Sequence, residues 1–177
     1  SKVEPRDVRM GLGIEEFDRE GRLIEADFDA FTLVTCYFPN GGNRGVRLDF
    51  KLAFYDAFLA HIDALRSAGR PVLFMGDLNV AHTEMDVARP AEAAKGTGFL
   101  PVERAFIDRL QAHGYIDTFR ALHPDETIYT FWDYLRRRWE RNAGLRIDHL
   151  LISPDLKPRL ASAGVDRIVR GRPHASD

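Results

Sequence analysis

The chain is organised around the stretch RPVLFMGDLN at residues 70–79. An apolar run from Val72 to Met75 lies between Pro71 and Gly76 and is followed by two polar side chains. A short apolar run with these boundaries predicts a strand that is buried on both faces. Loops at the carboxyl end of such a strand are open to solvent and held by a rigid sheet, so they often carry the chemistry of α/β proteins.

Asp77 and Asn79 follow the predicted strand and are two residues apart, so their side chains project to the same side of an extended segment. A carboxylate can hold a metal ion or activate water, and an amide can stabilise a developing oxyanion. The pair therefore suits a metal-assisted attack on a phosphate. Gly-Asp-Leu-Asn is a weak motif by itself, because Asp-x-Asn after a strand is more often a turn with an Asx cap.

The remaining sequence predicts strands and helices in a mixed α/β fold. Residues 12–28 alternate polar and apolar side chains, which predicts a hairpin, and residues 31–37 predict a core strand. Between residues 46 and 68, apolar side chains recur every three or four positions, which predicts a helix that ends at Gly69. The other predicted elements are a short helix from Pro101 to Gly114 and strands at 128–132, 145–152 and 163–170.

The composition is typical of a soluble globular protein, with 177 residues of which 45% are hydrophobic and 29% are charged. Cys36 is the one cysteine, so no internal disulfide is possible and a reducing compartment is expected. No apolar run has the length of a membrane span, and no signal-peptide pattern is present. We therefore expect an intracellular protein without a membrane association, cytoplasmic and nucleoid-associated if it is of bacterial type.

Positive charge is concentrated in the last quarter of the chain. Residues 134–177 contain 10 of the 25 basic side chains and 5 of the 27 acidic ones. A solvated basic face explains this asymmetry, and so does a surface that contacts nucleic-acid phosphates. Charge alone leaves both explanations open.

Two further polar residues lie among apolar neighbours. Asp148 is in the apolar run 145–152, where a carboxylate needs a partner. It either forms a salt bridge, for example with Arg146, or orients a histidine as carboxylates do in many hydrolytic sites. Tyr37 is either a core phenol with a satisfied hydroxyl or a donor to a phosphate oxygen.

Phe131 and Trp132, together with Leu145 and Ile147, are explained most simply as core residues. Adjacent side chains of one strand point to opposite faces, however, so one of the two aromatic rings can be exposed beside the basic segment. An exposed ring in that place could pack against a flipped-out base or a sugar. The histidines have no spacing typical of a zinc site.

These segments together resemble the exonuclease III family of apurinic/apyrimidinic endonucleases, within the endonuclease/exonuclease/phosphatase superfamily. The resemblance covers nearly the whole chain and implies one domain over residues 1–177 with two packed mixed β-sheets flanked by helices. It rests on Tyr37-Phe38-Pro39-Asn40, on GDLNVAH at 76–82, on the loop at 98–104, on YTFWDY at 129–134, on NAGLRID at 142–148 and on Ser176-Asp177.

The resemblance also implies roles for single residues. Asp77 would orient or deprotonate the attacking water, Asn79 would stabilise the pentacovalent phosphate and Tyr37 would bond the scissile phosphate. Asp148 would pair with the catalytic histidine. The implied cofactor is Mg²⁺, with Mn²⁺ as a possible substitute, and its implied protein ligands are Asp77, Asn79 and Asp177.

The implied partner is double-stranded DNA with abasic sites or 3′ ends, bound by a monomer. Asn40 would contact the DNA near the phosphate. Phe131, Leu145 and Ile147, with Trp132 beside them, would form a pocket that accepts a baseless sugar and excludes an ordinary nucleotide.

The sequence departs from the family pattern at both ends. It has no counterpart of the opening strands, which carry the glutamate that is the principal metal ligand, and it stops at Asp177, one residue before the expected histidine. Neither His149 nor His174 occupies that place. We therefore expect this polypeptide alone to be inactive and, because its sheet edges are unpaired, to fold poorly.

The predicted function is a Mg²⁺-dependent DNA-repair phosphodiesterase that cleaves 5′ to abasic sites and has possible 3′-5′ exonuclease activity. One alternative is another phosphoesterase of the superfamily that acts on RNA or phosphoinositides. The other is a DNA-binding module without catalysis.

Overall fold

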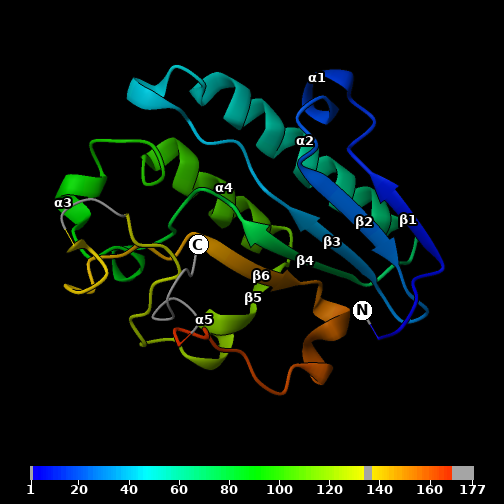
Figure 1. The fold of residues 1–177 in the computed structure, drawn as a ribbon. Helices are drawn as coiled ribbons and strands as arrows, with labels where there is room; N and C mark the ends of the chain where they lie inside the picture. The colour runs from blue at the N-terminus through cyan, green and yellow to red at the C-terminus, as the bar shows by residue number, and fades with distance from the viewer. Residues whose placement is uncertain (1, 134–136, 169–177) are drawn as a thin grey trace.

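The computed structural model describes residues 2–133 and 137–168, and its strands form one mixed sheet (Figure 1). The strand order is β1-β2-β3-β4-β6-β5. β3 and β4 are parallel, whereas the other neighbouring strands are antiparallel. The strands are β1 (Asp7–Met10), β2 (Leu23–Asp27), β3 (Thr32–Cys36), β4 (Val72–Asp77), β5 (Ile116–Asp117) and β6 (Asp148–Ile152).

The long helix α2 (Leu48–Ser67) connects the two parallel strands, as the geometry of a parallel pair requires. Of the helices in the described residues, none combines the length and the apolar character needed to cross a membrane. The other helices are α1 (Glu15–Asp18), α3 (Pro90–Ala93), α4 (Pro101–Ala112) and α5 (Thr118–Leu122), with short 3₁₀ helices at Asn43–Gly45, Glu84–Asp86 and Pro154–Arg159.

Most of the predicted elements near the central stretch are confirmed. The structure contains the predicted core strand β3, the helix α2, the strand β4 and the helix α4 at the expected places. The sequence patterns in and around residues 70–79 therefore predict these strands and helices correctly.

Three strand predictions were wrong. Residues 13–17, expected as a strand of a hairpin, include the helix α1, and β2 pairs instead with β1. The segment 128–132 forms only an isolated bridge between Phe131 and Leu145, because the hydroxyl of Thr130 accepts hydrogen bonds from the amides of Ile147 and Asp148 at 3.1 Å each, and further strand pairing would need these amides. Residues 163–168 form no strand, and the rest of that predicted strand lies outside the described residues.

The α/β class is confirmed, but the described residues form one sheet and not the predicted pair of packed sheets. Helices α2 and α4 cover one face, on which alternate residues of β3, β4 and β6 are buried. On the other face, Ile24, Met75 and Leu150 have 37% to 43% of their surface exposed. The register places these three in one row across the sheet.

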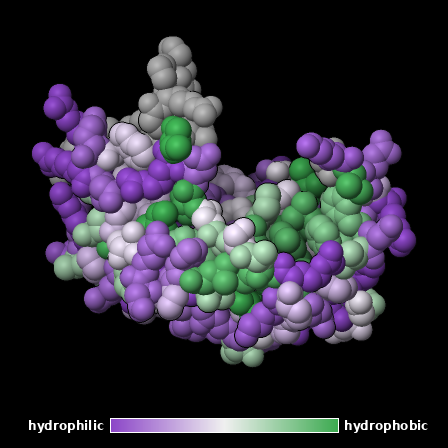
Figure 2. Space-filling view, turned by 90° about the horizontal axis from the view of Figure 1, so that it is seen from below, coloured by the Kyte–Doolittle hydropathy of each residue, from purple (hydrophilic) through white to green (hydrophobic). Residues whose placement is uncertain are grey.

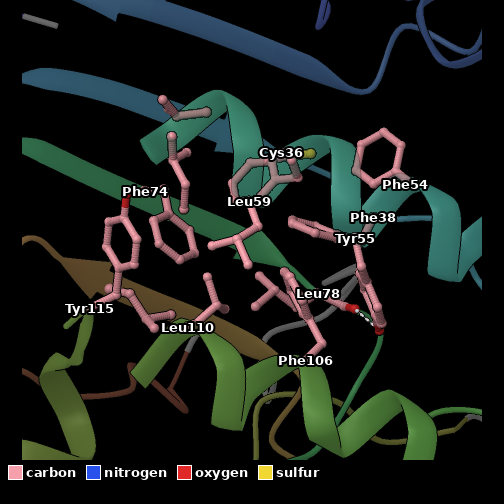
Figure 3. Packing of buried hydrophobic residues seen from close by; sticks show 14 of the residues in the cluster. Cys36, Phe38, Phe54, Tyr55, Leu59, Phe74, Leu78, Phe106, Leu110 and Tyr115 are labelled. Carbon is pink, nitrogen blue, oxygen red and sulfur yellow. Dashed lines mark hydrogen bonds between the residues drawn. The ribbon is translucent and has the colours of Figure 1, made fainter. Parts of the chain in front are cut away.

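The core between the sheet and its two helices is aromatic (Figure 3). The Phe38 ring lies 4.7 Å from that of Phe58 on α2, and Tyr55 stacks on Phe106 of α4 at 4.0 Å. Cys36 is buried beside them, and burial raises the pKa of its thiol to about 12. Rings packed at these distances hold β3, β4 and the two helices as one rigid unit.

Candidate active site

Three of the predicted site residues form one row on the open face of the sheet. Asp77 on β4 is directly opposite Asp148 on β6. β3 runs parallel to β4 with Thr35 beside Met75, so Tyr37, two residues further, comes beside Asp77. All three side chains line a cavity of about 820 Å³. Figure 2 shows one side of the molecule that is hollowed, with hydrophobic surface in the middle and hydrophilic residues around it.

Gly76 is required for the close approach of β3 and β4 in front of this row. Its φ is +146°, and a Cβ atom built there would lie 2.0 Å from the carbonyl oxygen of Cys36. A side chain at this position would push the two strands apart. The glycine of the central motif therefore brings Asp77 and Tyr37 together.

The carboxyl group of Asp77 has a pKa raised to about 6. Burial is the main cause, and the charge of Asp148 adds to it, whereas the amide of Asn79, His149 and Lys51 act in the opposite direction. Two carboxylates of this kind, side by side, repel each other when both are ionised. A cation between them would remove that repulsion.

The described residues therefore fit a magnesium site only in its minimal form. Among them, no three His, Cys, Asp or Glu side chains are close enough to hold a metal ion together. Mg²⁺ is commonly bound through one or two carboxylates, with water and substrate phosphate as its other ligands, and Asp77 with Asp148 meets that requirement. Asp177, the third predicted ligand, lies outside the described residues.

Asn79 forms the turn after β4, in the left-handed region with a φ of +52°. Its amide donates to Oδ1 of Asp77 at 2.7 Å, which is the Asx turn that the sequence also suggested. Its side-chain Nδ2 donates to the carbonyl of Phe38 at 2.8 Å, and its Oδ1 accepts from Asn40 at 3.0 Å. The oxygen that was predicted to bind a metal thus already has a partner.

The residues predicted to bind DNA are only partly brought together. Phe131 and Trp132 line the cavity, but Leu145 and Ile147 do not. The latter two pack with Phe131 in a small separate core, from behind the cavity wall. Trp132 is buried with its ring 4.6 Å from that of Trp139, and Phe131 is half-buried.

A buried ion network around Arg146, which also lines the cavity, was not predicted from the sequence. Nε of Arg146 donates to Asp86 at 2.7 Å, and its Nη1 lies 2.8 Å from Oδ2 of Asp117. Burial alone raises the pKa of Asp86, but the hydrogen bond and charge of Arg146 outweigh it and lower this pKa to about 2. Arg146 is therefore the partner of these two carboxylates, and the predicted pairing of Arg146 with Asp148 was wrong.

His149 and Thr130 also line the cavity and were not predicted. His149 is buried, donates from Nε2 to the carbonyl of Val80 at 2.9 Å, and has its Nδ1 atom 3.6 Å from Asp117. Thr130 holds the amide of Asp148 at 3.1 Å. The sequence had no signal for His149, because adjacent side chains of a strand point to opposite faces and Asp148 was the residue assigned to the site.

The sequence of the chain identifies its family. The sequence profile of the Endonuclease/Exonuclease/phosphatase family matches residues 1–177. The chain belongs to this family. The resemblance seen in its sequence motifs is thereby confirmed.

Relatives and solved structures place the chain near the DNA-repair nucleases of the Endonuclease/Exonuclease/phosphatase family. It is 40% identical over 174 residues to the DNA repair nuclease APEX1 of Danio rerio, covering 98% of this chain and 56% of that protein. It is 37% identical over 175 residues to an exodeoxyribonuclease of Bacillus subtilis, covering 98% of this chain and 69% of that protein. A 3′ phosphatase from Neisseria bound to a product DNA hairpin has a TM-score of 0.90 and 26% identity, covering 100% of this chain and 69% of that one.

The chain thus spans between 56% and 69% of the length of these two curated family members. The mixed sheet and its flanking helices belong to the part of the fold that is shared with the solved structure.

Proposed function

We propose that the full-length protein is a DNA-repair phosphodiesterase that depends on Mg²⁺, or on Mn²⁺ in its place, and cleaves the DNA backbone 5′ to abasic sites. The observation that carries this proposal is the row of Tyr37, Asp77 and Asp148 at one end of a large cavity. Phosphodiester hydrolysis needs a carboxylate for water or metal beside donors for the phosphate oxygens, and this row supplies both.

Each residue of the row has a chemical task in this proposal. The raised pKa of Asp77 makes its carboxylate a better proton acceptor for the attacking water near neutral pH. Tyr37, half-exposed at the cavity, donates from its hydroxyl to a phosphate oxygen. A divalent ion would be held by Asp77 and Asp148, with Asp177 and the second lone pair of the Asn79 side-chain oxygen as further proposed ligands, and would supply positive charge for the phosphate.

Asn79 is suited to stabilise the charge that develops on the phosphate. Its amide nitrogen carries two hydrogens, and the carbonyl of Phe38 takes one of them. The second is available for a phosphoryl oxygen. Since four hydrogen bonds fix the residue, that donor needs little reorganisation during the reaction.

Abasic DNA is proposed as the substrate because an aromatic wall closes the cavity beside the row. Phe131 and Trp132 lie in that wall, and Arg167 lies 5.5 Å from the ring of Trp132. A sugar without a base can enter such a pocket, whereas a base must be excluded or unstacked. Trimming of 3′ ends is the proposed second activity, with the phosphate bound by the same row of Tyr37, Asp77 and Asp148.

Cleavage of defined substrates by the full-length protein tests the proposal. We expect Mg²⁺-dependent incision 5′ to an abasic analogue in duplex DNA, slower trimming of a recessed 3′ end, and no turnover of RNA or a phosphoinositide. Asn79→Ala should lower turnover about 100-fold or more, the usual loss when one transition-state donor is removed. Abasic DNA that is bound but left intact with Mg²⁺ would instead favour a non-catalytic module, and preferred cleavage of RNA or phosphoinositide would favour the other phosphoesterases.

A further inference from the structure

A fully buried ion pair lies beneath the candidate site. Lys51 on α2 and Glu103 on α4 are both 0% exposed, and their Nζ and Oε1 atoms are 2.5 Å apart. Burying two charges is costly, and a pair of apolar residues at such a position is often equally stable. The pair therefore calls for a role other than packing.

Lys51 has a second partner, which is the backbone of the candidate site. Its Nζ donates to the carbonyl oxygen of Asn79 at 2.7 Å. One turn further along α2, the hydroxyl of Tyr55 donates to the carbonyl of Leu78 at 3.4 Å (Figure 3). One face of α2 thus holds two successive carbonyl groups of the turn that carries Asn79.

Glu103 holds the neighbouring loop 97–100. It accepts the amides of Gly98 at 2.7 Å and of Leu100 at 3.0 Å, together with the hydroxyl of Thr97 at 2.7 Å. The carbonyl of Gly98 in turn accepts the amide of Ala81 at 2.8 Å. Lys51 and Glu103 therefore connect the loop 97–100 to the segment 79–81 through groups with no exposed surface.

The conformation of Asn79 explains why this support matters. A φ of +52° costs asparagine less than it costs most residues but more than it costs glycine, so the hydrogen bonds around Asn79 help to keep this conformation. Without a donor for its carbonyl, the peptide after Asn79 can rotate, and the amide that faces the substrate moves with it.

We propose that Lys51 and Glu103 are positioning residues that fix the backbone at Asn79 and thereby the aim of its side-chain amide. The inference rests on the proposed function and deepens it, because neither side chain touches the substrate. Accordingly, loss of the pair should lower turnover even where stability is restored and substrate binding is unchanged.

Four variants of the full-length protein separate positioning from stability. Lys51→Met leaves Glu103 buried and unpaired, so it should lose both stability and turnover. Lys51→Met with Glu103→Gln removes both charges, so its stability should recover, but Asn79 still lacks a donor for its carbonyl. Lys51→Arg keeps a donor. Arg109→Met is the matched control, because Arg109 forms an exposed ion pair with Asp56 between the same two helices.

Single-turnover cleavage of abasic duplex should fall about 10-fold to 100-fold in the double variant, as expected for a small misplacement of a catalytic group, with KM unchanged. Lys51→Arg should restore part of the rate and Arg109→Met should not change it. Rates are compared well below the unfolding temperature of each variant. Recovery of the rate together with stability in the double variant would overturn the proposal.

Amide hydrogen exchange at Asn79 and Ala81 gives a readout that does not need cleavage. Exchange there should be faster in the double variant than in wild type or Arg109→Met, while exchange in β4 is unchanged. Equal exchange in all of them would refute the positioning role. If the wild-type protein cleaves none of the DNA substrates, the proposed function fails, and the exchange result still decides whether the pair fixes this turn.

Discussion

Two buried ion networks flank the segment that follows β4, and they differ in what they hold. The pair of Lys51 and Glu103 bonds to the backbone at Asn79 and at Gly98. The network of Arg146, Asp86 and Asp117 connects the segment just before β6 to the 3₁₀ helix at Glu84–Asp86 and to the end of β5. The first holds a turn that carries a candidate catalytic residue, whereas the second holds Arg146 in the lining of the cavity and has no bond to that turn. Although the two networks are alike in chemistry and burial, we therefore expect their loss to affect activity and stability differently.

The largest effect on stability is expected from breaking the second network. Arg146→Met leaves Asp86 and Asp117 buried without their cation and should lower the free energy of unfolding by about 3–5 kcal/mol. Turnover per folded molecule should change much less than in the Lys51→Met, Glu103→Gln variant. Urea unfolding and single-turnover cleavage of the same preparations measure both quantities.

The two networks would not differ as proposed if Arg146→Met lowered turnover per folded molecule as strongly as the Lys51→Met, Glu103→Gln variant does. Asp86→Asn and Asp117→Asn added to Arg146→Met form the control, since they remove the unpaired charges and should return part of the lost stability.

The second network should also make stability depend on acid. The pKa of Asp86 is lowered to about 2 and that of Asp117 is lowered as well, so both carboxylates favour the folded state when ionised. A lowered pKa gives stability that is complete above the unfolded value of about 4 and is lost as the pH falls toward the folded value. For Asp86 this amounts to about 2 kcal/mol, from a shift of nearly two pKa units.

Urea midpoints of the wild type and of Asp86→Asn between about pH 5 and about pH 2 test this dependence. The wild type should lose more stability over that range than the variant. If the urea midpoints of the two proteins fell in parallel with pH, the ion pair of Asp86 with Arg146 would not stabilise the folded state.

The smallest effect is expected at the exposed ion pair of Asp56 and Arg109, which joins the same helices as Lys51 and Glu103. Its side chains are 65% and 49% exposed, so solvent screens the attraction. Arg109→Met should change the free energy of unfolding by about 0.5 kcal/mol or less. A change comparable to that of Lys51→Met would mean that the contact between α2 and α4, and not burial of the charges, decides the outcome.

The sequence predicts well where a local pattern determines the structure. The apolar run before Gly76 predicts β4, the three and four residue spacing predicts α2, and the polar pair after the strand predicts the site. Lys51 also had a local signal, because with Tyr55, Phe58 and Ile62 it follows the spacing of the buried helix face. A lysine in such a stripe indicates a buried partner.

Other features depend on contacts between distant segments. Arg146 meets Asp86 and Asp117 across 60 and 29 positions of the chain, and neither pairing has a local pattern. Likewise, the β-branched and aromatic residues at 128–132 have strand propensity, but the Thr130 hydroxyl takes the amides of Ile147 and Asp148, at the start of β6, that strand pairing would need. Propensity cannot reveal which partner a segment finds.

The central claim is that Asp77 and Asp148 act on one phosphate as a unit. Single-turnover cleavage of abasic duplex by full-length wild type, Asp77→Asn, Asp148→Asn and the double variant tests it most directly. If the two act together, each single variant loses most of the rate and the double variant is only slightly slower than the worse single variant. Independent, multiplying losses, or a rate that either substitution leaves unchanged, would contradict the account.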